Sequence, residues 1–299
     1  MTSTHRKTNH LFKLFLSTLL MGLVIILVIT SCASDAPLRQ TTTPSPEEES
    51  GTAVPVDPSA TTEAEGDTIA RIQGAAHISP YRGQLVSGVE GVVTVVRADG
   101  FYMQSLTPDD DPATSEGIFV FTDVIPSAKV GDVVQVDGRV TEMTPGGGYG
   151  NLSRTQINDP EVTVLSRGND LPEPTIIGEG GRMPPTEVID DVTEGFITES
   201  SYFDPENHGL DFYESLEGML VQVNNAVVVG PTNRFKEIVV LPDFGAWASV
   251  RTLRGGIVIR PGDFNPERVI LDDALVETPF VKVGDVATGP IIGVMDYDY

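Results

Sequence analysis

The residue types in this chain that could carry chemistry are four histidines, one cysteine and many carboxylates. His5 and His10 lie close to the N-terminus. His77 and His208 are far apart, so the sequence holds no HExxH helix and no other compact histidine motif for zinc. A GxSxG nucleophile turn, a Walker phosphate loop and a GxGxxG dinucleotide loop are also absent from the sequence. We therefore predict no catalytic residues.

The densest run of carboxylates is Asp109, Asp110 and Asp111, in a predicted hairpin loop that precedes Asp123. Carboxylate oxygens bind Ca²⁺ and Mg²⁺, so this run is the candidate site for either ion, although the spacing of an EF-hand is not met. A solvated acidic turn is the alternative that we favour. The same two alternatives apply to a second acidic stretch, which holds Asp263, Glu267, Asp272 and Asp273, with Arg268 as a local ion-pair partner.

The only cysteine, Cys32, ends an apolar N-terminal segment. Basic residues precede an uncharged run over residues 14–29, and the sequence then reads Ile-Thr-Ser-Cys. This resembles the lipobox of bacterial lipoprotein precursors, in which cleavage before the cysteine leaves it lipidated. A membrane-spanning anchor is the alternative, since residues 11–31 approach the ~20 residues that cross a bilayer. Both alternatives place the remainder outside the cytoplasm, and we predict a protein held at the bacterial cell membrane by a lipid on Cys32.

The chain divides by composition into five parts. Residues 1–31 are the predicted lipoprotein signal peptide. Residues 32–66 are rich in Thr, Ser, Pro and Glu and have few large apolar residues, so we expect a disordered tether. The rest is long enough for two domains, which we place at 67–167 and 213–299 with a connector at 168–212.

The folded part shows short apolar runs separated by turn residues, and hardly any helical periodicity. This pattern is typical of an all-β barrel or sandwich. A short helix is expected around residues 211–217, and a weaker one over 184–191. The predicted strands are residues 84–96, 100–105, 117–122, 133–143, 162–165, 219–229, 237–241, 256–260 and 290–296.

Two short strings recur in the same order in the two predicted domains. Residues 87–93 (SGVEGVV) resemble residues 215–221 (SLEGMLV), and KVGDV occurs at 129–133 and again at 282–286. An internal repeat of one design would explain both. We therefore expect two OB-like small β-barrels in tandem.

The first predicted domain resembles the OB-fold region at the front of secreted bacterial nucleases of the endonuclease/exonuclease/phosphatase superfamily. The resemblance rests on IQG at 72–74, His77, SPY at 79–81, GVEGVVT at 88–94, GFYMQ at 100–104, ATSEGIFV at 113–120 and VGD at 130–132. YESLEGM at 213–219, DFNPER at 263–268 and GVMDY at 293–297 resemble the stretch that follows in those proteins. The catalytic domain of that family, with its Asn, Glu, His and Asp residues, has no counterpart here, so hydrolysis cannot be assigned to this chain.

An OB barrel binds ligands through aromatic and basic side chains on its second and third strands. The corresponding candidates for contacting single-stranded nucleic acid are Tyr81, Arg97, Phe101, Tyr102, Gln104 and Lys129. Phe101 and Tyr102 are neighbours on one strand and must face opposite sides, so one of them belongs to the core. For each candidate, packing or a solvated charge is the alternative.

The charge of the chain argues against a polyanionic ligand. It has 19 Lys and Arg against 43 Asp and Glu, a net charge of −24. Proteins that neutralise several phosphates normally carry a basic stripe, whereas acidity by itself keeps an exported protein soluble. Three functions stay open: a lipid-anchored, non-catalytic accessory part of a nuclease system whose catalytic domain lies downstream or in another chain, a surface module that binds glycan or protein, and a spacer.

Overall fold

Residues 67–147, 151–191, 197–200 and 202–297 are described by the computed structural model, and most of them lie in strands or in the loops that join strands. The all-β fold class is therefore confirmed. The predicted signal peptide, Cys32 and the predicted tether lie outside the described residues. No helix among the residues described is long and apolar enough to cross a membrane.

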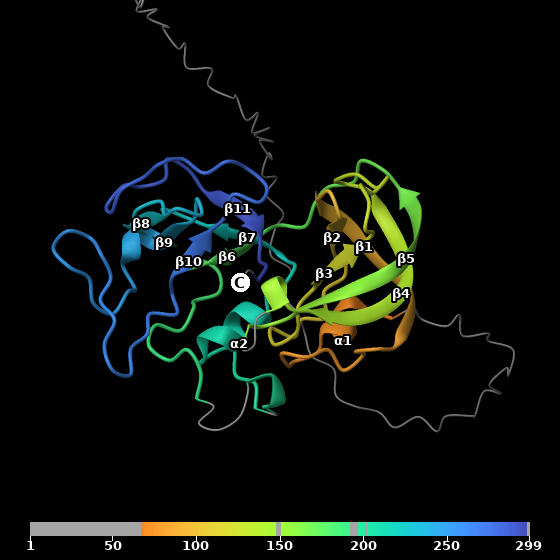
Figure 1. The fold of residues 1–299 in the computed structure, drawn as a ribbon, viewed down its shortest axis with the longest axis horizontal. Coiled ribbons are helices and arrows are strands. Elements are labelled where there is room, and N and C mark those ends of the chain that lie inside the picture. The colour runs from red at the N-terminus through yellow and green to blue at the C-terminus, as the bar shows by residue number, and fades with distance from the viewer. Residues whose placement is uncertain (1–66, 148–150, 192–196, 201, 298–299) are drawn as a thin grey trace, which may run out of the picture. The chain divides into compact units, whose positions relative to one another are not determined.

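The first part of the fold is a closed barrel of five strands (Figure 1). The strands are joined in the order β1-β2-β3-β5-β4, and β4 pairs with β1 to close the ring. β3 and β5 run parallel, and the other neighbours are antiparallel. The strands are β1 (Leu85–Val96), β2 (Gly100–Gln104), β3 (Gly117–Phe121), β4 (Val133–Met143) and β5 (Arg154–Ser166), and a short 3-10 turn, η1 (Pro145–Gly147), follows β4.

A short helix, α1 (Ile69–Gln73), packs against the barrel core ahead of β1. The side chain of Thr68 caps its first turn by accepting a hydrogen bond from the Arg71 N–H at 3.3 Å. The helix ends at Gly74, whose φ of 69° is in the region that favours glycine. Ile69 and Ile72 are buried in the same core as Phe101 and Ile118, so the helix extends the apolar interior of the barrel.

The C-terminal half contains two small sheets and a second short helix. The sheets have the strand orders β10-β9-β8 and β11-β7-β6. Their core holds Ile177, Phe212, Leu216, Val223 and Val240. The elements are β6 (Thr175–Ile177), η2 (Ile197–Glu199), α2 (Gly209–Glu214), β7 (Leu220–Val223), β8 (Val227–Gly230), β9 (Ile238–Leu241), η3 (Asp243–Gly245), β10 (Val269–Leu271) and β11 (Ile291–Val294).

The strands of the C-terminal half repeat the pairing of the barrel. β8 pairs with β9 in the register in which β1 pairs with β2, with an irregularity at the same place. The barrel pairs Val92↔Gln104, Val93↔Met103 and Val95↔Tyr102 correspond to Val227↔Leu241, Val228↔Val240 and Gly230↔Val239. Likewise, Phe101↔Val120, Tyr102↔Phe119 and Met103↔Ile118 correspond to Ile238↔Leu271, Val239↔Ile270 and Val240↔Val269.

The two KVGDV strings form the same turn in both halves. The Gly131 N–H donates to the Val93 carbonyl at 2.9 Å, and the Gly284 N–H donates to the Val228 carbonyl at 2.8 Å. The predicted internal repeat is therefore confirmed for this turn and for the strands. The alignment of 87–93 with 215–221 is wrong, because the strand pairing matches Val92 to Val227.

Three predictions about the C-terminal half need correction. It supplies counterparts of β1 to β4, but within the described residues it has no counterpart of β5 and is not a closed barrel. The segment predicted as a connector contains β6, which pairs in parallel with β7 and places Ile177 in the core. Residues 184–191 form no helix and residues 256–260 form no strand, whereas β6 and β10 were not predicted.

The barrel and the C-terminal sheets form one compact unit. Their backbones touch where Gly117 at the start of β3 meets Gly218 ahead of β7. A Cβ atom on Gly117 would lie 2.1 Å from the Gly218 carbonyl carbon, so only glycine fits there. Gly218 itself has a φ of 73°. The expected boundary between two independent domains is thus a continuous packed junction.

Candidate functional site at the junction

A buried histidine links the barrel to helix α2. His77 follows α1, and its Nε2 lies 2.7 Å from Oδ1 of Asp211, while its Nδ1 lies 3.0 Å from Oε2 of Glu214. All three side chains are buried. Asp211 and Glu214 are three residues apart on α2 and therefore face the same side of the helix. Both ring nitrogens of His77 are thus held by carboxylates of the other half of the molecule.

The charge state of His77 follows from these contacts. Burial lowers its pKa, but the hydrogen bonds and charges of Asp211 and Glu214 outweigh that effect and raise the pKa to about 9. Near neutral pH the imidazole is therefore a cation between two carboxylates. With no exposed nitrogen, it is not placed to transfer protons to a substrate.

A third carboxylate of the junction, Glu217, is buried with hydrogen bonds to the barrel. Its Oε1 accepts from Nε2 of Gln73 at 3.1 Å and from the Thr155 N–H at 3.0 Å. Burial, reinforced by the charge of Glu214, raises the pKa of Glu217 well above its ordinary value. The hydroxyl of Tyr297 donates to Oε2 of Glu214 at 2.6 Å. Several ionisable groups are therefore buried at the junction.

The outer surface of β2 and β3 carries a second polar cluster at the same junction. Arg154 at the start of β5 donates from Nη1 to Oδ2 of Asp296 at 2.8 Å and to the Tyr102 hydroxyl at 3.0 Å. The Tyr102 hydroxyl in turn donates to Asp296. The guanidinium of Arg154 lies 4.0 Å from the ring centroid of Phe119. Asp296, which follows β11, thus binds the aromatic and basic side chains of the barrel.

The same surface is covered further by the start of β7. The Leu220 N–H donates to Oε1 of Gln104 at 2.9 Å. Arg97, at the end of β1, points its Nη1 to within 3.6 Å of Asp296. Strands that bind ligands in OB barrels are therefore occupied here by the chain's own C-terminal half.

Half of the residues predicted to bind nucleic acid are buried. Phe101 lies in the barrel core, and Tyr102 and Gln104 are buried under the C-terminal half. Tyr81 packs against the barrel core, which agrees with the structural alternative. Lys129 is exposed in the turn before β4 and Arg97 is partly exposed. The expected stacking surface on β2 is therefore not exposed.

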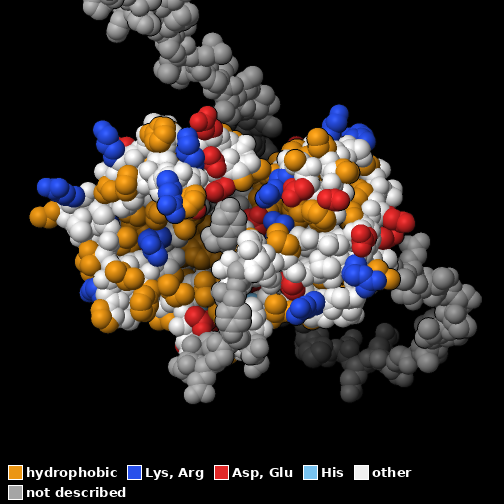
Figure 2. Space-filling view, in the orientation of Figure 1, with side chains coloured by type: hydrophobic (Ala, Val, Ile, Leu, Met, Phe, Trp, Pro, Cys, Tyr) orange, Lys and Arg blue, Asp and Glu red, His pale blue; other side chains and the backbone are white. Residues whose placement is uncertain are grey.

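Basic side chains elsewhere do not replace that surface. On the face drawn in Figure 2, the described Lys and Arg side chains lie in separate patches and form no continuous stripe. Two of the described arginines are already paired, since Arg260 binds Asp263 at 2.6 Å and Arg167 binds Asp132 at 2.6 Å. This distribution of basic side chains is unfavourable for binding the phosphate backbone of a nucleic acid.

In the acidic loop predicted as a metal site, carboxylate oxygens accept hydrogen bonds from the backbone of the same loop. Oδ1 of Asp109 accepts from the Asp111 N–H at 2.8 Å, and Oδ1 of Asp111 accepts from the Ala113 N–H at 2.9 Å. Asp110 is exposed at a φ of 65°. The structure does not bring oxygens of Asp109, Asp110 and Asp111 together as it does those of Asp190 and Asp211, and the loop forms a self-bonded acidic turn.

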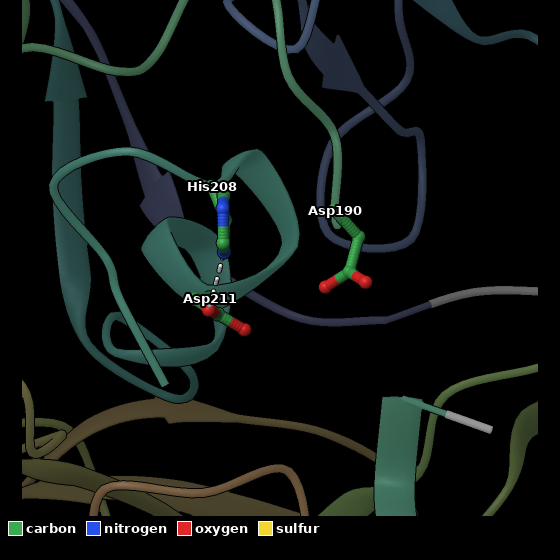
Figure 3. A group of neighbouring side chains, drawn as sticks. All are labelled: Asp190, His208 and Asp211. Atoms are coloured by element: carbon green, nitrogen blue, oxygen red, sulfur yellow. Dashed lines mark ion pairs between the residues drawn. The ribbon is translucent and has the colours of Figure 1, made fainter. Parts of the chain in front are cut away.

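The group of described carboxylates and histidines that approaches the geometry of a metal site is Asp190, His208 and Asp211 (Figure 3). One ligand-type atom from each lies within 4.8 Å of the others. However, Oδ1 of Asp211 is bound to His77, and its Oδ2 accepts from the Asp204 N–H at 2.7 Å. Nδ1 of His208 lies 3.4 Å from that same Oδ2. These contacts make Asp211 the centre of a hydrogen-bonded network that already holds the His77 cation, which opposes binding of a metal cation.

Sequence reasoning missed this network. His77 and Asp211 are 134 positions apart, and no short motif connects them. Only the pairing of an isolated buried histidine with two carboxylates on one face of a short helix could have suggested it.

The comparisons with known proteins concern the C-terminal half. Residues 176–299 are similar to a family described as Domain of unknown function (DUF8508). The similarity begins inside β6, where the C-terminal sheets begin, and not at residue 213. No curated protein and no solved structure matched the chain.

Proposed function

We propose that this protein is a lipid-anchored, extracytoplasmic and non-catalytic β module that binds a protein partner. The observation that carries the proposal is that the C-terminal half covers the outer surface of β2 and β3. Asp296 and Leu220 occupy the side chains with which an OB barrel would hold an oligonucleotide or oligosaccharide. The barrel surface therefore serves to hold the C-terminal half in place.

The burial of the ionisable side chains at the junction supports a non-catalytic role. His77 is held on both nitrogens, and Glu217 is bonded to Gln73 and Thr155. A general acid or base must reach a substrate atom, and neither side chain has an exposed atom that could do so. The resemblance to the front region of secreted nucleases is compatible with such an accessory role, with catalysis supplied by another chain or domain.

Binding of single-stranded DNA tests the proposal against the nucleic-acid alternative. A labelled oligonucleotide is titrated with the full chain in detergent at physiological salt, in chelator and in Mg²⁺. With little counterion release and a net charge of −24, we expect binding no tighter than ~10 μM. The Asp296→Asn variant, which removes the carboxylate beside the partly exposed Arg97, should bind more tightly than wild type, while Glu173→Gln at an exposed position should not. Nanomolar binding of wild type in chelator would contradict the proposal.

Lipid anchoring is tested separately at Cys32. Because the thiol is the acceptor of the lipid, Cys32→Ala should abolish incorporation of labelled fatty acid and leave an uncleaved precursor. Cys32→Ser is the matched control that keeps the size and polarity of the side chain, and it should behave like Cys32→Ala. Undiminished labelling of both variants would contradict lipid attachment at Cys32.

A further inference from the structure

Three oxygen-bearing side chains alternate along the loop that leads into β10. Asp263, Asn265 and Glu267 are buried, with 3 %, 2 % and 2 % of their surface exposed. The chain turns sharply between them, because Asn265 has a φ of 55°. Residues 246–268, which join η3 to β10, contain no helix and no strand longer than a single bridge. A loop of this length without secondary structure inside a compact domain is usually functional.

Each of these three side chains keeps a buried oxygen that has no hydrogen-bond donor. Oδ1 of Asp263, Oδ1 of Asn265 and both carboxylate oxygens of Glu267 have no partner within the described residues. Backbone N–H groups of Ser249 and of Glu267 itself face the Glu267 carboxylate, but neither makes a hydrogen bond of normal geometry. Burying an acceptor without a partner is unfavourable, most of all for a carboxylate. These oxygens therefore point to a bound cation or to bound water.

The two carboxylates come together at Ser249. The Ser249 hydroxyl donates to Oδ2 of Asp263 at 2.7 Å, and the Ser249 N–H faces the carboxylate of Glu267. Burial raises the pKa of Glu267, and the charge of Asp263 adds to the increase, as expected for neighbouring carboxylates. Nδ2 of Asn265 donates to the Val258 carbonyl at 3.2 Å, which leaves Oδ1 as its acceptor atom. Carboxylate and amide oxygens thus collect in one buried turn.

Arginines beside this turn offset part of its negative charge. Nη2 of Arg260 lies 2.6 Å from Oδ2 of Asp263, and Nε of Arg268 donates to the Asn265 carbonyl at 2.9 Å. Neither guanidinium is hydrogen-bonded to the oxygens that lack a partner. The side chain of Arg260 is 48 % exposed, so water screens its charge. The turn therefore keeps room for a cation, which it would hold with modest affinity.

We propose that Asp263, Asn265 and Glu267 bind Ca²⁺. Two carboxylates and one amide offer only oxygen ligands, which hard cations prefer. Both oxygens of Glu267 lack a donor, which fits the bidentate carboxylate of many Ca²⁺ sites, whereas Mg²⁺ keeps several of its waters. We expect a dissociation constant of ~0.1–1 mM, the range of extracellular Ca²⁺ modules. Binding of the ion goes beyond the proposed role in binding a protein and does not depend on it.

Terbium luminescence reports on this turn through the only tryptophan of the chain. Trp247 and Glu267 line the same small pocket. Tb³⁺ takes the oxygen ligands of Ca²⁺, so it should luminesce when Trp247 is excited in the full chain in detergent. Ca²⁺ should displace Tb³⁺ at least tenfold better than Mg²⁺ does. Glu267→Gln should weaken Tb³⁺ binding at least tenfold, whereas Asp272→Asn, at an exposed carboxylate after β10, should leave it unchanged.

Thermal unfolding of the full chain in chelator and in Ca²⁺ is the second measurement. About 10 mM Ca²⁺ should raise the melting temperature of wild type by roughly 3–6 °C for a dissociation constant of ~1 mM. Glu267→Gln should lose most of this increase. In chelator the same variant should melt no lower than wild type, because a buried carboxylate without a partner is itself unfavourable.

Four outcomes would overturn the Ca²⁺ site. An absence of any Ca²⁺ effect at about 10 mM would leave water as the partner of these oxygens. Equal effects of Mg²⁺ and Ca²⁺ would contradict the choice of ion. A response that Asp109→Asn abolishes and Glu267→Gln keeps would move the ion to the acidic turn after β2. Melting of Glu267→Gln below wild type in chelator would show that the Glu267 carboxylate is satisfied without an ion.

Discussion

His77 is the residue through which pH should act on this protein. Its folded-state pKa of about 9 exceeds the ordinary 6.5. The folded protein therefore holds a proton that the unfolded chain releases between these values. The stabilisation is fully present below pH 6.5 and is lost as the pH rises through about 9. The raised pKa of Glu217 acts in the same direction, since it too favours the protonated form in the folded state.

We expect the free energy of unfolding to fall between pH 6.5 and pH 9 by at most about 3 kcal/mol from His77. Urea unfolding at a series of pH values measures this. His77→Gln removes the titrating group and should flatten the dependence, whereas His208→Gln, at the other described histidine, should keep it. An unchanged slope in His77→Gln would show that the carboxylates of α2 do not hold a histidine cation.

At the scale of elements, the junction depends on a close approach of β3 to the turn before β7. A methyl group on Gly117 would lie 2.1 Å from the Gly218 carbonyl carbon, and both contacting groups are backbone. The two halves would have to separate to accept it, and this would also lengthen the bonds of Gln73 and Gln104 to the C-terminal half.

Gly117→Ala should therefore destabilise the protein by several kcal/mol, about the upper range for single substitutions. Gly289→Ala is the control, because nothing lies within 4 Å of a Cβ atom there and its backbone does not require glycine. Chemical denaturation of both variants gives the comparison. Equal stability of Gly117→Ala and wild type would mean that the two halves do not pack as described.

The elements differ in how well the sequence predicts them. β1 and β4 were predicted almost to the residue, because long runs of Val alternate with polar residues and end at clear turns. β10 and β6 have three residues each, too few to give a period, and they form only because neighbouring strands offer a partner. β5 begins at Arg154, eight residues before the predicted strand, since its first part is polar and binds the C-terminal half.

The candidate site was less predictable than the fold. The sequence predicted that one of Phe101 and Tyr102 lies in the core and the other on the barrel surface, and the structure places Phe101 in the core and Tyr102 on the outer surface of β2. The sequence could not reveal that Asp296 and Leu220, more than a hundred residues later, cover Tyr102 and Gln104. Covering of this kind depends on the packing of two halves and leaves no local pattern.

At the scale of the whole molecule, the barrel and the C-terminal half are two copies of a repeat that pack together in one compact unit. Ion pairs, buried carboxylates and backbone contact join them, and each half completes the burial of the other. If the surface of β2 and β3 serves to hold the C-terminal half, loss of one contact there should weaken both halves together.

Scanning calorimetry of the full chain in detergent, with wild type and Asp296→Ala compared, tests this most directly. We predict one cooperative transition in both proteins, with the midpoint of the variant lower by roughly 3–10 °C, because Arg154 is left buried without its carboxylate. Glu173→Ala, at an exposed carboxylate, should leave the midpoint unchanged. Two separate transitions, of which Asp296→Ala shifts one or neither, would contradict the account.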